Sequence, residues 1–214
     1  MFNFTTIIAN IPALLIGFAF HEYAHAWVAD RLGDPTPRSQ GRLTMNPFVH
    51  LDIFGTLMAV LYSFGWAKPV QTQPHYFKGN RERGRILVSM AGPLANLVVA
   101  FVAMFLWIIT LSFLEDSSWS NVISQLFMSV VVMNLGLGVF NLLPIPPLDG
   151  FSILRGIVPG KYSQVLNTLE TYGMFILVII LFTNFLGAVL HPVVSGLYAF
   201  YRDTALFLLS PFVG

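Results

Sequence analysis

Long apolar runs dominate the chain, and the pattern they form is that of membrane-crossing helices. A transmembrane helix needs about 20 largely apolar residues to cross the hydrocarbon core of a bilayer. The strong runs are 6–29, 86–114, 121–146 and 170–190; the weaker ones are 51–66, which is short, and 193–213, which Arg202 and Asp203 interrupt. The pattern predicts an all-α polytopic membrane protein with about five to six membrane helices, folded as a single domain over residues 1–214.

The composition supports this class and excludes several kinds of chemistry. Hydrophobic residues make up 56% of the 214 residues and charged residues only 10%, whereas an average soluble domain contains about 25% charged residues. Mean hydropathy is +0.72. The net charge of +1 gives no indication of a nucleic-acid partner, and the absence of cysteine excludes disulfides, cysteine-ligated zinc and thiol catalysis. No Lys or Arg precedes the first apolar run, so we expect a retained helix there and not a signal peptide.

The distribution of Lys and Arg predicts the orientation of the helices. Segments 30–50, 67–85 and 147–169 carry basic residues, whereas the loop at 115–120 carries two acids and no base. Basic loops stay on the cytoplasmic side of a membrane. The three basic segments are therefore predicted to be cytoplasmic, and the loop and the N-terminus external, so that the first helix runs inward.

The short run 51–66 lies between two of these basic segments, so it cannot cross the membrane once if both are cytoplasmic. It contains Gly55 and Gly65, and it fits a re-entrant element or one that lies along the membrane. The turn-rich sequence GDPTPRSQGRLTMNP before it and AKPVQTQPHYF after it predict short extended or hairpin segments.

Ionisable residues interrupt the first apolar run in the sequence HEYAH, residues 21–25. Residues i and i+4 share one face of a helix, so His21 and His25 can present their imidazoles to one metal ion, while Glu22 can reach a metal-bound water and take its proton. A chance motif, or two histidines satisfied by neighbouring helices, is the alternative. A charge at the centre of a membrane helix costs about 2.5–3.5 kcal/mol, so such residues are usually functional, which favours the metal site.

A catalytic zinc site needs a third protein ligand and one open position. His50 and His75 lie in polar segments where surface histidines are expected, and His191 stands at a predicted helix boundary on the external side. Asp149 is the better candidate, because it follows the prolines of FNLLPIPPLDG, where a broken helix must be packed in protein or line a wet cavity. A turn aspartate beside glycine is the alternative. Charge counting places Asp149 and the HEYAH motif on the same side of the membrane, so they can meet.

Several motifs together resemble the site-2 protease family of intramembrane zinc metalloproteases, in its compact bacterial-type branch. They are HEYAH (21–25), RLGDPTPRSQGRLTMNPFVHLDIFGT (31–56), FGWAKPV (64–70), AGPLAN (91–96) and NLLPIPPLDG (141–150). They occur in family order and cover most of residues 15–156. Ile53 stands where proline is expected, and we find no PDZ-like insert and no C-terminal regulatory domain.

The resemblance implies a three-helix catalytic core and a role for each matched position. The residues that would bind one Zn²⁺ per chain are His21, His25 and Asp149. Glu22 would be the general base and acid, and Asn141 would hold the scissile carbonyl or its oxyanion, a task that suits a neutral amide. An interhelical hydrogen bond is the alternative for Asn141. Gly92 is expected to permit close helix approach, and Asn96 to contact the substrate.

The implied function is that of an intramembrane zinc endopeptidase acting in regulated intramembrane proteolysis. It would hydrolyse peptide bonds in or near transmembrane segments, in the cell (inner) membrane, with its active site toward the cytoplasm. Its expected partners are a transmembrane protein substrate and the lipid bilayer, and homo-oligomerisation is left open. An edge strand from 36–50 or 67–77 could hold the substrate by strand addition, and 51–66 could act as a gate.

Other functions fit the sequence less well. A metal or ion transporter would need several ligand sites along a path, whereas the sequence offers one cluster. A binding module with structural zinc would use four protein ligands, and we find three. A scaffold without metal would leave the buried His, Glu and Asp unexplained.

Overall fold

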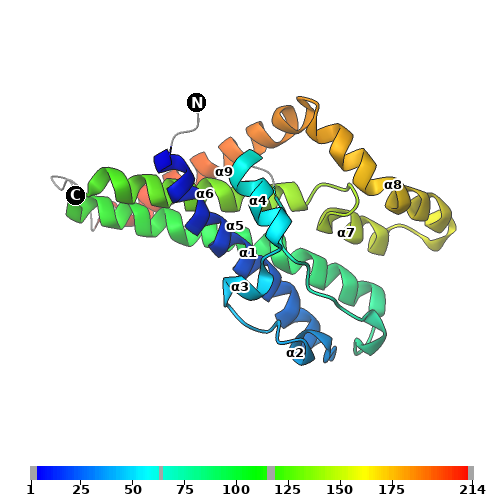
Figure 1. The fold of residues 1–214 in the computed structure, drawn as a ribbon. Helices are drawn as coiled ribbons and strands as arrows, with labels where there is room; N and C mark the ends of the chain where they lie inside the picture. The colour runs from blue at the N-terminus through cyan, green and yellow to red at the C-terminus, as the bar shows by residue number, and fades with distance from the viewer. Residues whose placement is uncertain (1–3, 63–64, 115–118, 212–214) are drawn as a thin grey trace.

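The computed structural model describes residues 4–62, 65–114 and 119–211, and helices make up most of this part of the chain (Figure 1). The helices are α1 (Phe4–Arg31), α2 (Thr36–Ser39), α3 (Pro47–His50), α4 (Ile53–Tyr62), α5 (Arg81–Leu114), α6 (Ser120–Asn141), α7 (Asp149–Ile157), α8 (Ser163–Leu181) and α9 (Phe185–Leu209). Two 3-10 turns are η1 (Pro74–Tyr76) and η2 (Gly160–Tyr162). The all-α prediction is confirmed for these residues. Glu115 and Asp116, the acids of the predicted external loop, lie outside the described residues.

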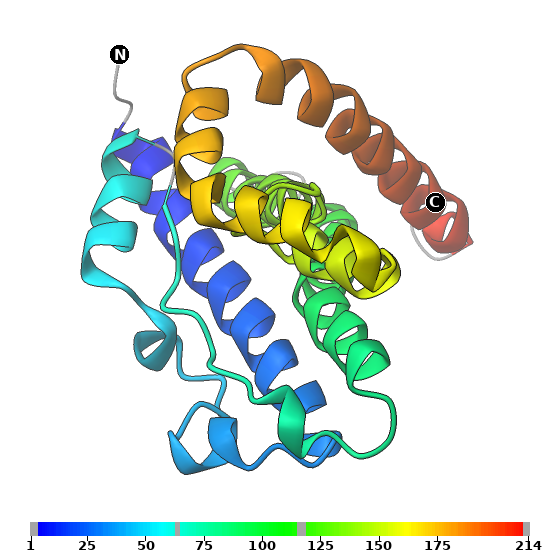
Figure 2. The same cartoon turned by 90° about the vertical axis from the view of Figure 1, so that its right-hand side faces the viewer.

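Helices α1, α5 and α6 pack against one another as the predicted three-helix core, with α9 against α5 and α6 (Figures 1 and 2). Helix pairs in a membrane approach most closely where side chains are small. Gly17 of α1 faces α6, and a Cβ built on it would lie 2.6 Å from Cδ1 of Leu137. Ala13, Ala100 and Leu135 have no exposed area in the same core.

Among the residues that the structure describes, three helices are long and apolar enough to cross a membrane: Arg81–Phe113, Ser120–Asn141 and Gly160–Leu181. Helices α1 and α9 have 28 and 25 residues, which corresponds to about 42 and 38 Å at 1.5 Å per residue, more than the hydrocarbon core of about 30 Å. Arg202 and Asp203, the charges in α9, pair with each other, with Nε 2.9 Å from Oδ1. A total of about five to six spans stays a prediction.

The apolar run 170–190 does not form one helix, and that prediction is wrong. Helix α8 ends and α9 begins inside it, and the chain changes direction sharply between them (Figure 2). Thr183 lies in this turn: its hydroxyl donates to the carbonyl of Ile180 and accepts from the N–H of Phe185. Such side-chain bonds compete with helical backbone bonds. His191, predicted at a helix boundary, consequently lies inside α9.

Helix α6 ends at Asn141, five residues before the predicted end of its apolar run at 146. The prolines of the following LPIPPL stretch lack backbone N–H groups and cannot continue the helical bonds. Helix α8 lies against this stretch, and a Cβ built on its Gly173 would lie only 2.9 Å from the carbonyl oxygen of Pro146. The stretch leads directly into α7, whose first residue is Asp149.

The first part of the connection between α1 and α5 holds two short helices, and residues 40–46 between them form no strand, so an edge strand at 36–50 is wrong. Helices α2 and α3 occupy its two ends, and each has a proline in its first turn. Proline is favoured there because the first helical N–H groups have no partner within the helix, and its φ angle suits a helix.

The second part of the connection contains α4 and a non-helical stretch, residues 67–73, which we call segment 67–73. Helix α4 has 10 residues and rises about 15 Å, half of what one crossing of a bilayer requires. That α4 does not cross alone agrees with the prediction for 51–66; a re-entrant path and a gate stay predictions. Segment 67–73 begins at an isolated antiparallel bridge between Leu51 and Ala67 and passes beside α1 (Figure 2).

Candidate metal centre

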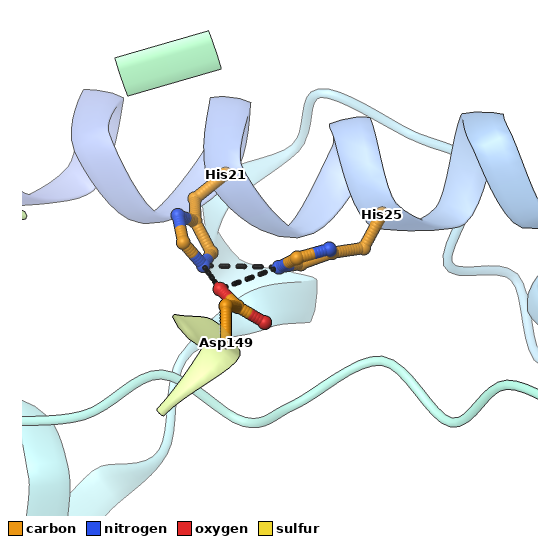
Figure 3. Close-up of side chains that lie close together, drawn as sticks. All are labelled: His21, His25 and Asp149. Atoms are coloured by element: carbon orange, nitrogen blue, oxygen red, sulfur yellow. Dashed lines mark hydrogen bonds and ion pairs between the residues drawn. The ribbon is translucent and has the colours of Figure 1, made fainter. Parts of the chain in front are cut away.

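His21 and His25 lie one turn apart on α1, on the face that meets the start of α7 (Figure 3). Each is buried, with 8% of its surface exposed, and their Nε2 atoms are 3.0 Å apart. Oδ2 of Asp149 lies 3.2 Å from Nε2 of His21 and 3.3 Å from Nε2 of His25. The structure therefore brings the three residues that the sequence suggested as metal ligands to one point.

The hydrogen bond on the far side of the His25 ring determines which of its nitrogens is protonated. Nδ1 of His25 lies 2.7 Å from the carbonyl oxygen of Val88 in α5. A carbonyl oxygen can only accept, so Nδ1 must carry the proton. In the neutral ring, Nε2 of His25 then presents its lone pair, which is the form that binds a metal.

The ring of His21 is fixed in the same way, through a side chain. Its Nδ1 lies 2.6 Å from Oδ1 of Asn96. The amide nitrogen of Asn96 donates to the carbonyl of Gly17 at 3.0 Å and to Oδ1 of Asn134 at 2.9 Å. Because both N–H bonds of Asn96 are in use, its oxygen accepts, and Nδ1 of His21 carries the proton. In its neutral form, the His21 ring also presents a lone pair at Nε2.

These lone pairs and the carboxylate oxygen of Asp149 converge, and the arrangement fits a zinc ion. With both rings neutral, three acceptor atoms lie 3.0–3.3 Å apart, and a cation placed among them would satisfy all three. Tetrahedral zinc with bonds of about 2.0–2.2 Å separates neighbouring ligand atoms by about 3.3–3.6 Å, close to the spacing observed. Two histidines and one carboxylate form a known catalytic zinc set that leaves a fourth position open.

Gly92 of α5 makes room for both imidazoles. A Cβ built on Gly92 would lie 2.7 Å from Cε1 and Nε2 of His21, and closer still to Nε2 of His25. Real Cβ atoms do not come so near to other atoms. The predicted close helix approach at Gly92 is confirmed, and the groups that approach it are the two metal-facing rings.

Asp149 is placed by the turn that precedes α7. The next residue, Gly150, is buried against the end of α6, where an added Cβ would collide with the carbonyls of Leu142 and Leu143. Burial opposes ionisation of Asp149, but the charge and hydrogen bonds of His25 and His21 in their protonated form outweigh burial and hold the pKa of the Asp149 carboxyl well below its usual range. The group is therefore a carboxylate, the form that ligates metal ions.

Glu22 lies next to the first histidine and is also buried, with 6% of its surface exposed. Its Oε2 accepts a hydrogen bond from the backbone N–H of Val70 at 2.8 Å. This bond joins α1 to segment 67–73 and orients one oxygen of the carboxylate. A buried carboxylate beside two histidines that could bind a metal ion is suited to base-assisted hydrolysis.

A family model described as peptidase family M50 matches residues 9–113 and 108–183 of the chain. The chain belongs to peptidase family M50. It is 41% identical over 203 residues to "Putative zinc metalloprotease YwhC" of Bacillus subtilis, a match that covers 94% of this chain and 90% of that protein. Two further relatives are also called putative zinc metalloproteases. Rip2 of Mycolicibacterium smegmatis is 31% identical over 182 residues, which cover 81% of this chain and 66% of Rip2. MJ0611 of Methanocaldococcus jannaschii is 30% identical over 158 residues, which cover 72% of this chain and 73% of MJ0611. No solved structure matches the chain.

The M50 match confirms the resemblance to site-2 proteases, and the two remaining site predictions can be placed in the structure. Asn141 is the last residue of α6; it is half-buried, and its Nδ2 donates to the carbonyl of Leu137 at 3.0 Å. Asn96 has no exposed area and lies behind His21. A substrate contact does not follow from that position of Asn96.

His50 is not a surface residue of this M50 peptidase, contrary to the prediction. It has no exposed area, and its Nε2 lies 2.8 Å from the carbonyl oxygen of Thr44. The contact with Thr44 joins the ring to the polar stretch before α4. His75, in η1, is exposed as expected.

Sequence reasoning missed three partners of the site. Asn134 is a polar residue in a long apolar run, the same signal that drew attention to HEYAH, and could have been found. Val88 and Val70 act through their backbone carbonyl and N–H. Their side chains give no signal of these roles.

Proposed function

We propose that this M50 chain is a zinc endopeptidase that hydrolyses peptide bonds in or near transmembrane segments of membrane proteins. One observation carries the proposal: lone-pair atoms of three buried or half-buried side chains converge beside a buried carboxylate. The residues that would hold the zinc ion are His21, His25 and Asp149. The carboxylate is that of Glu22.

Zinc, when bound, supplies Lewis acidity that makes a water more acidic and a carbonyl carbon more electrophilic. Glu22 takes a proton from the water as the water oxygen adds to the carbonyl carbon of the scissile amide. Glu22 then returns that proton to the amide nitrogen as the C–N bond breaks, so that a carboxylic acid and an amine leave. The N–H of Val70 keeps the Glu22 carboxylate directed during both transfers.

The two asparagines take different parts in this proposal. The side-chain amide of Asn141 has two N–H bonds, and its contact with Leu137 uses one. The second would donate to the scissile carbonyl oxygen as negative charge develops there. Asn96 instead positions His21, since its oxygen fixes the orientation and tautomer of that ring.

The proposed location is the cell membrane, with the site toward the cytoplasm. The metal-facing end of α1 leads into the basic segment 30–50, and α7 carries Arg155 at its end. A transmembrane substrate would then be cut near its cytoplasmic end, in regulated intramembrane proteolysis. Because a helix keeps its amides in internal hydrogen bonds, the substrate must unwind locally before attack.

Segment 67–73 is the remaining candidate for holding the unwound substrate by strand addition, since 36–50 consists of two short helices joined by turns. Successive residues of an extended chain direct their N–H groups to opposite sides. Val70 directs its N–H to α1. The N–H of Gln71 would therefore point the other way and meet the substrate. Gln71→Pro should therefore raise KM, and an unchanged KM would argue against strand addition here.

An ion transporter is not favoured by the structure. Within residues 4–62, 65–114 and 119–211, His21, His25 and Asp149 form the only metal-capable group of three or more such side chains. A transport path would need further ligand sites along the membrane normal.

The proposal is tested by pairing metal content with hydrolysis in detergent, for the wild type and Glu22→Gln. Both should hold about one zinc per chain, and the variant should hydrolyse a transmembrane substrate about 10²–10⁴-fold more slowly, as expected for loss of a general base. Normal cleavage by Glu22→Gln would show that the base is assigned wrongly. A wild type that binds no zinc would refute the metal site.

A further inference from the structure

Arg42 is a buried cation in the connection between α1 and α5, with 5% of its surface exposed. Its Nη1 donates to the carbonyl of Val49, and its Nη2 donates to the carbonyls of Lys68 at 3.0 Å and Pro69 at 3.1 Å. Burying a charge is costly unless it is hydrogen-bonded, so loss of any of these contacts would be unfavourable. The guanidinium thereby ties the chain before α4 to segment 67–73.

The carbonyl of Pro69 and the N–H of Val70 belong to the same peptide unit. Arg42 binds the oxygen of this unit, and Glu22 accepts its N–H at 2.8 Å. A peptide unit is planar, and its trans form directs the C=O and the N–H in opposite directions. Arg42 and Glu22 therefore stand at opposite ends of one rigid group.

Segment 67–73 is fastened on both sides of this peptide unit. The N–H of Lys68 donates to the carbonyl of His50 at 2.8 Å, and the N–H of Gln73 donates to Oδ2 of Asp34 at 2.5 Å. The peptide unit consequently has little freedom to turn. A positive charge at its oxygen also polarises its N–H, which strengthens the bond on the other side.

We propose that Arg42 is a positioning residue for the hydrolysis, which holds the Pro69–Val70 peptide so that its N–H fixes the carboxylate of Glu22. The inference rests on the proposed function in the role it gives to Glu22. The histidine ligands are oriented by other partners, so disturbing this peptide should impair proton transfer and leave metal binding intact.

The N–H of Val70 can be removed without changing Arg42. Val70→Pro deletes the donor, whereas Val70→Ala trims the side chain and keeps the N–H. Loss of a hydrogen-bonding partner of this kind typically costs about 10–100-fold in activity. We expect Val70→Pro to lower kcat by about that factor relative to Val70→Ala, with zinc content near one per chain and KM changed less than kcat. Equal kcat values for the two variants would overturn the proposal.

Arg42 is tested by Arg42→Ala and by Arg42→Lys, which keeps the charge but lacks the fork that binds two carbonyls. Arg42→Ala should lower kcat as Val70→Pro does. The kcat of Arg42→Lys should lie between those of Arg42→Ala and the wild type. Arg38→Ala is the matched control, because Arg38 is exposed and pairs with Asp30. A wild-type kcat in Arg42→Ala would overturn the proposal.

The combination of Arg42→Ala and Val70→Pro tests whether both residues act through one peptide. Residues that act through the same contact are not additive, whereas independent ones are. The double variant should be no slower than the slower single variant. Losses that multiply would show that Arg42 supports the fold by another route and would overturn the inference.

Hydrogen exchange gives a readout that does not depend on activity. Arg42→Ala should speed exchange in peptides covering 67–73, and Arg38→Ala should not; unchanged exchange in Arg42→Ala would count against the link. Failure of the proposed function is distinguishable, since it would appear as normal cleavage by Glu22→Gln. If Glu22→Gln is inactive while Arg42→Ala and Val70→Pro cleave normally, only the present inference fails.

Discussion

Gly92→Ala adds a single methyl group at the point where α5 meets both metal-facing rings. The new Cβ would lie 2.7 Å from two atoms of His21, and ordinary contact begins at 3.4 Å. The helices or the rings must therefore separate by at least about 0.7 Å, because Nε2 of His25 lies closer still to the new Cβ, and a misplacement of about 1 Å can cost 10²-fold in catalysis.

The expected results follow from this shift. Zinc affinity should fall by about 10–100-fold, as it does when the support of a ligand is lost. Overpacking of the α1–α5 interface should also lower the free energy of unfolding by about 1–3 kcal/mol. Zinc affinity is measured by competition with a chelator in detergent, and cleavage of a transmembrane substrate is measured at saturating zinc.

Gly136→Ala in α6 is the matched control, because nothing lies within 4 Å of a Cβ built there. Replacing a helical glycine by alanine in open space should be neutral or stabilise the helix by about 0.5–1 kcal/mol. Wild-type zinc affinity and cleavage in Gly92→Ala would refute the packing account. So would equal damage from both substitutions.

Further predictions concern the support of the site and the fold around it. Asn96→Ala removes the acceptor of the His21 ring, and chelator competition should show zinc affinity lowered by about 10–100-fold; unchanged affinity would contradict the positioning role. Gly173→Ala should press α8 away from Pro146 and destabilise the protein by about 1–3 kcal/mol, seen as a lower thermal midpoint, whereas Gly187→Ala, where a Cβ meets open space, should not. Prolonged dialysis against a strong chelator should abolish cleavage, and added zinc should restore it; full activity without metal would contradict zinc dependence.

The sequence predicted the parts of this fold that depend on local apolar pattern. The core helices α1, α5 and α6 lie within or close to their predicted runs. The prediction of one helix over 170–190 failed, because the apolar composition continues through the turn between α8 and α9. Thr183 and Asn184 are short polar residues in an otherwise apolar run, and their preference for turns was the signal that was overlooked.

The residues that converge at the candidate metal centre could be singled out because ionisable side chains are rare in apolar helices. HEYAH and Asp149 could therefore be recognised individually, and the structure places them together. The hydrogen bonds that orient them could not be predicted, because carbonyls such as that of Val88 carry no sequence signature. The burial of His50 was hidden for a related reason, since its ring contacts a backbone carbonyl, that of Thr44.

The hydrogen bonds of Asn96 also restrict how the three core helices can be arranged. They connect α5 to Gly17 and His21 of α1 and to Asn134 of α6. Each such bond contributes about 0.6–2 kcal/mol in a membrane, whereas an unsatisfied polar group in hydrocarbon costs several kcal/mol. Sliding or rotating one helix by a single residue would break these bonds. The free-energy cost of such an alternative packing is therefore larger than the stabilisation that the bonds give to the observed one. Helices that could otherwise exchange among similar packings are thus held in one register.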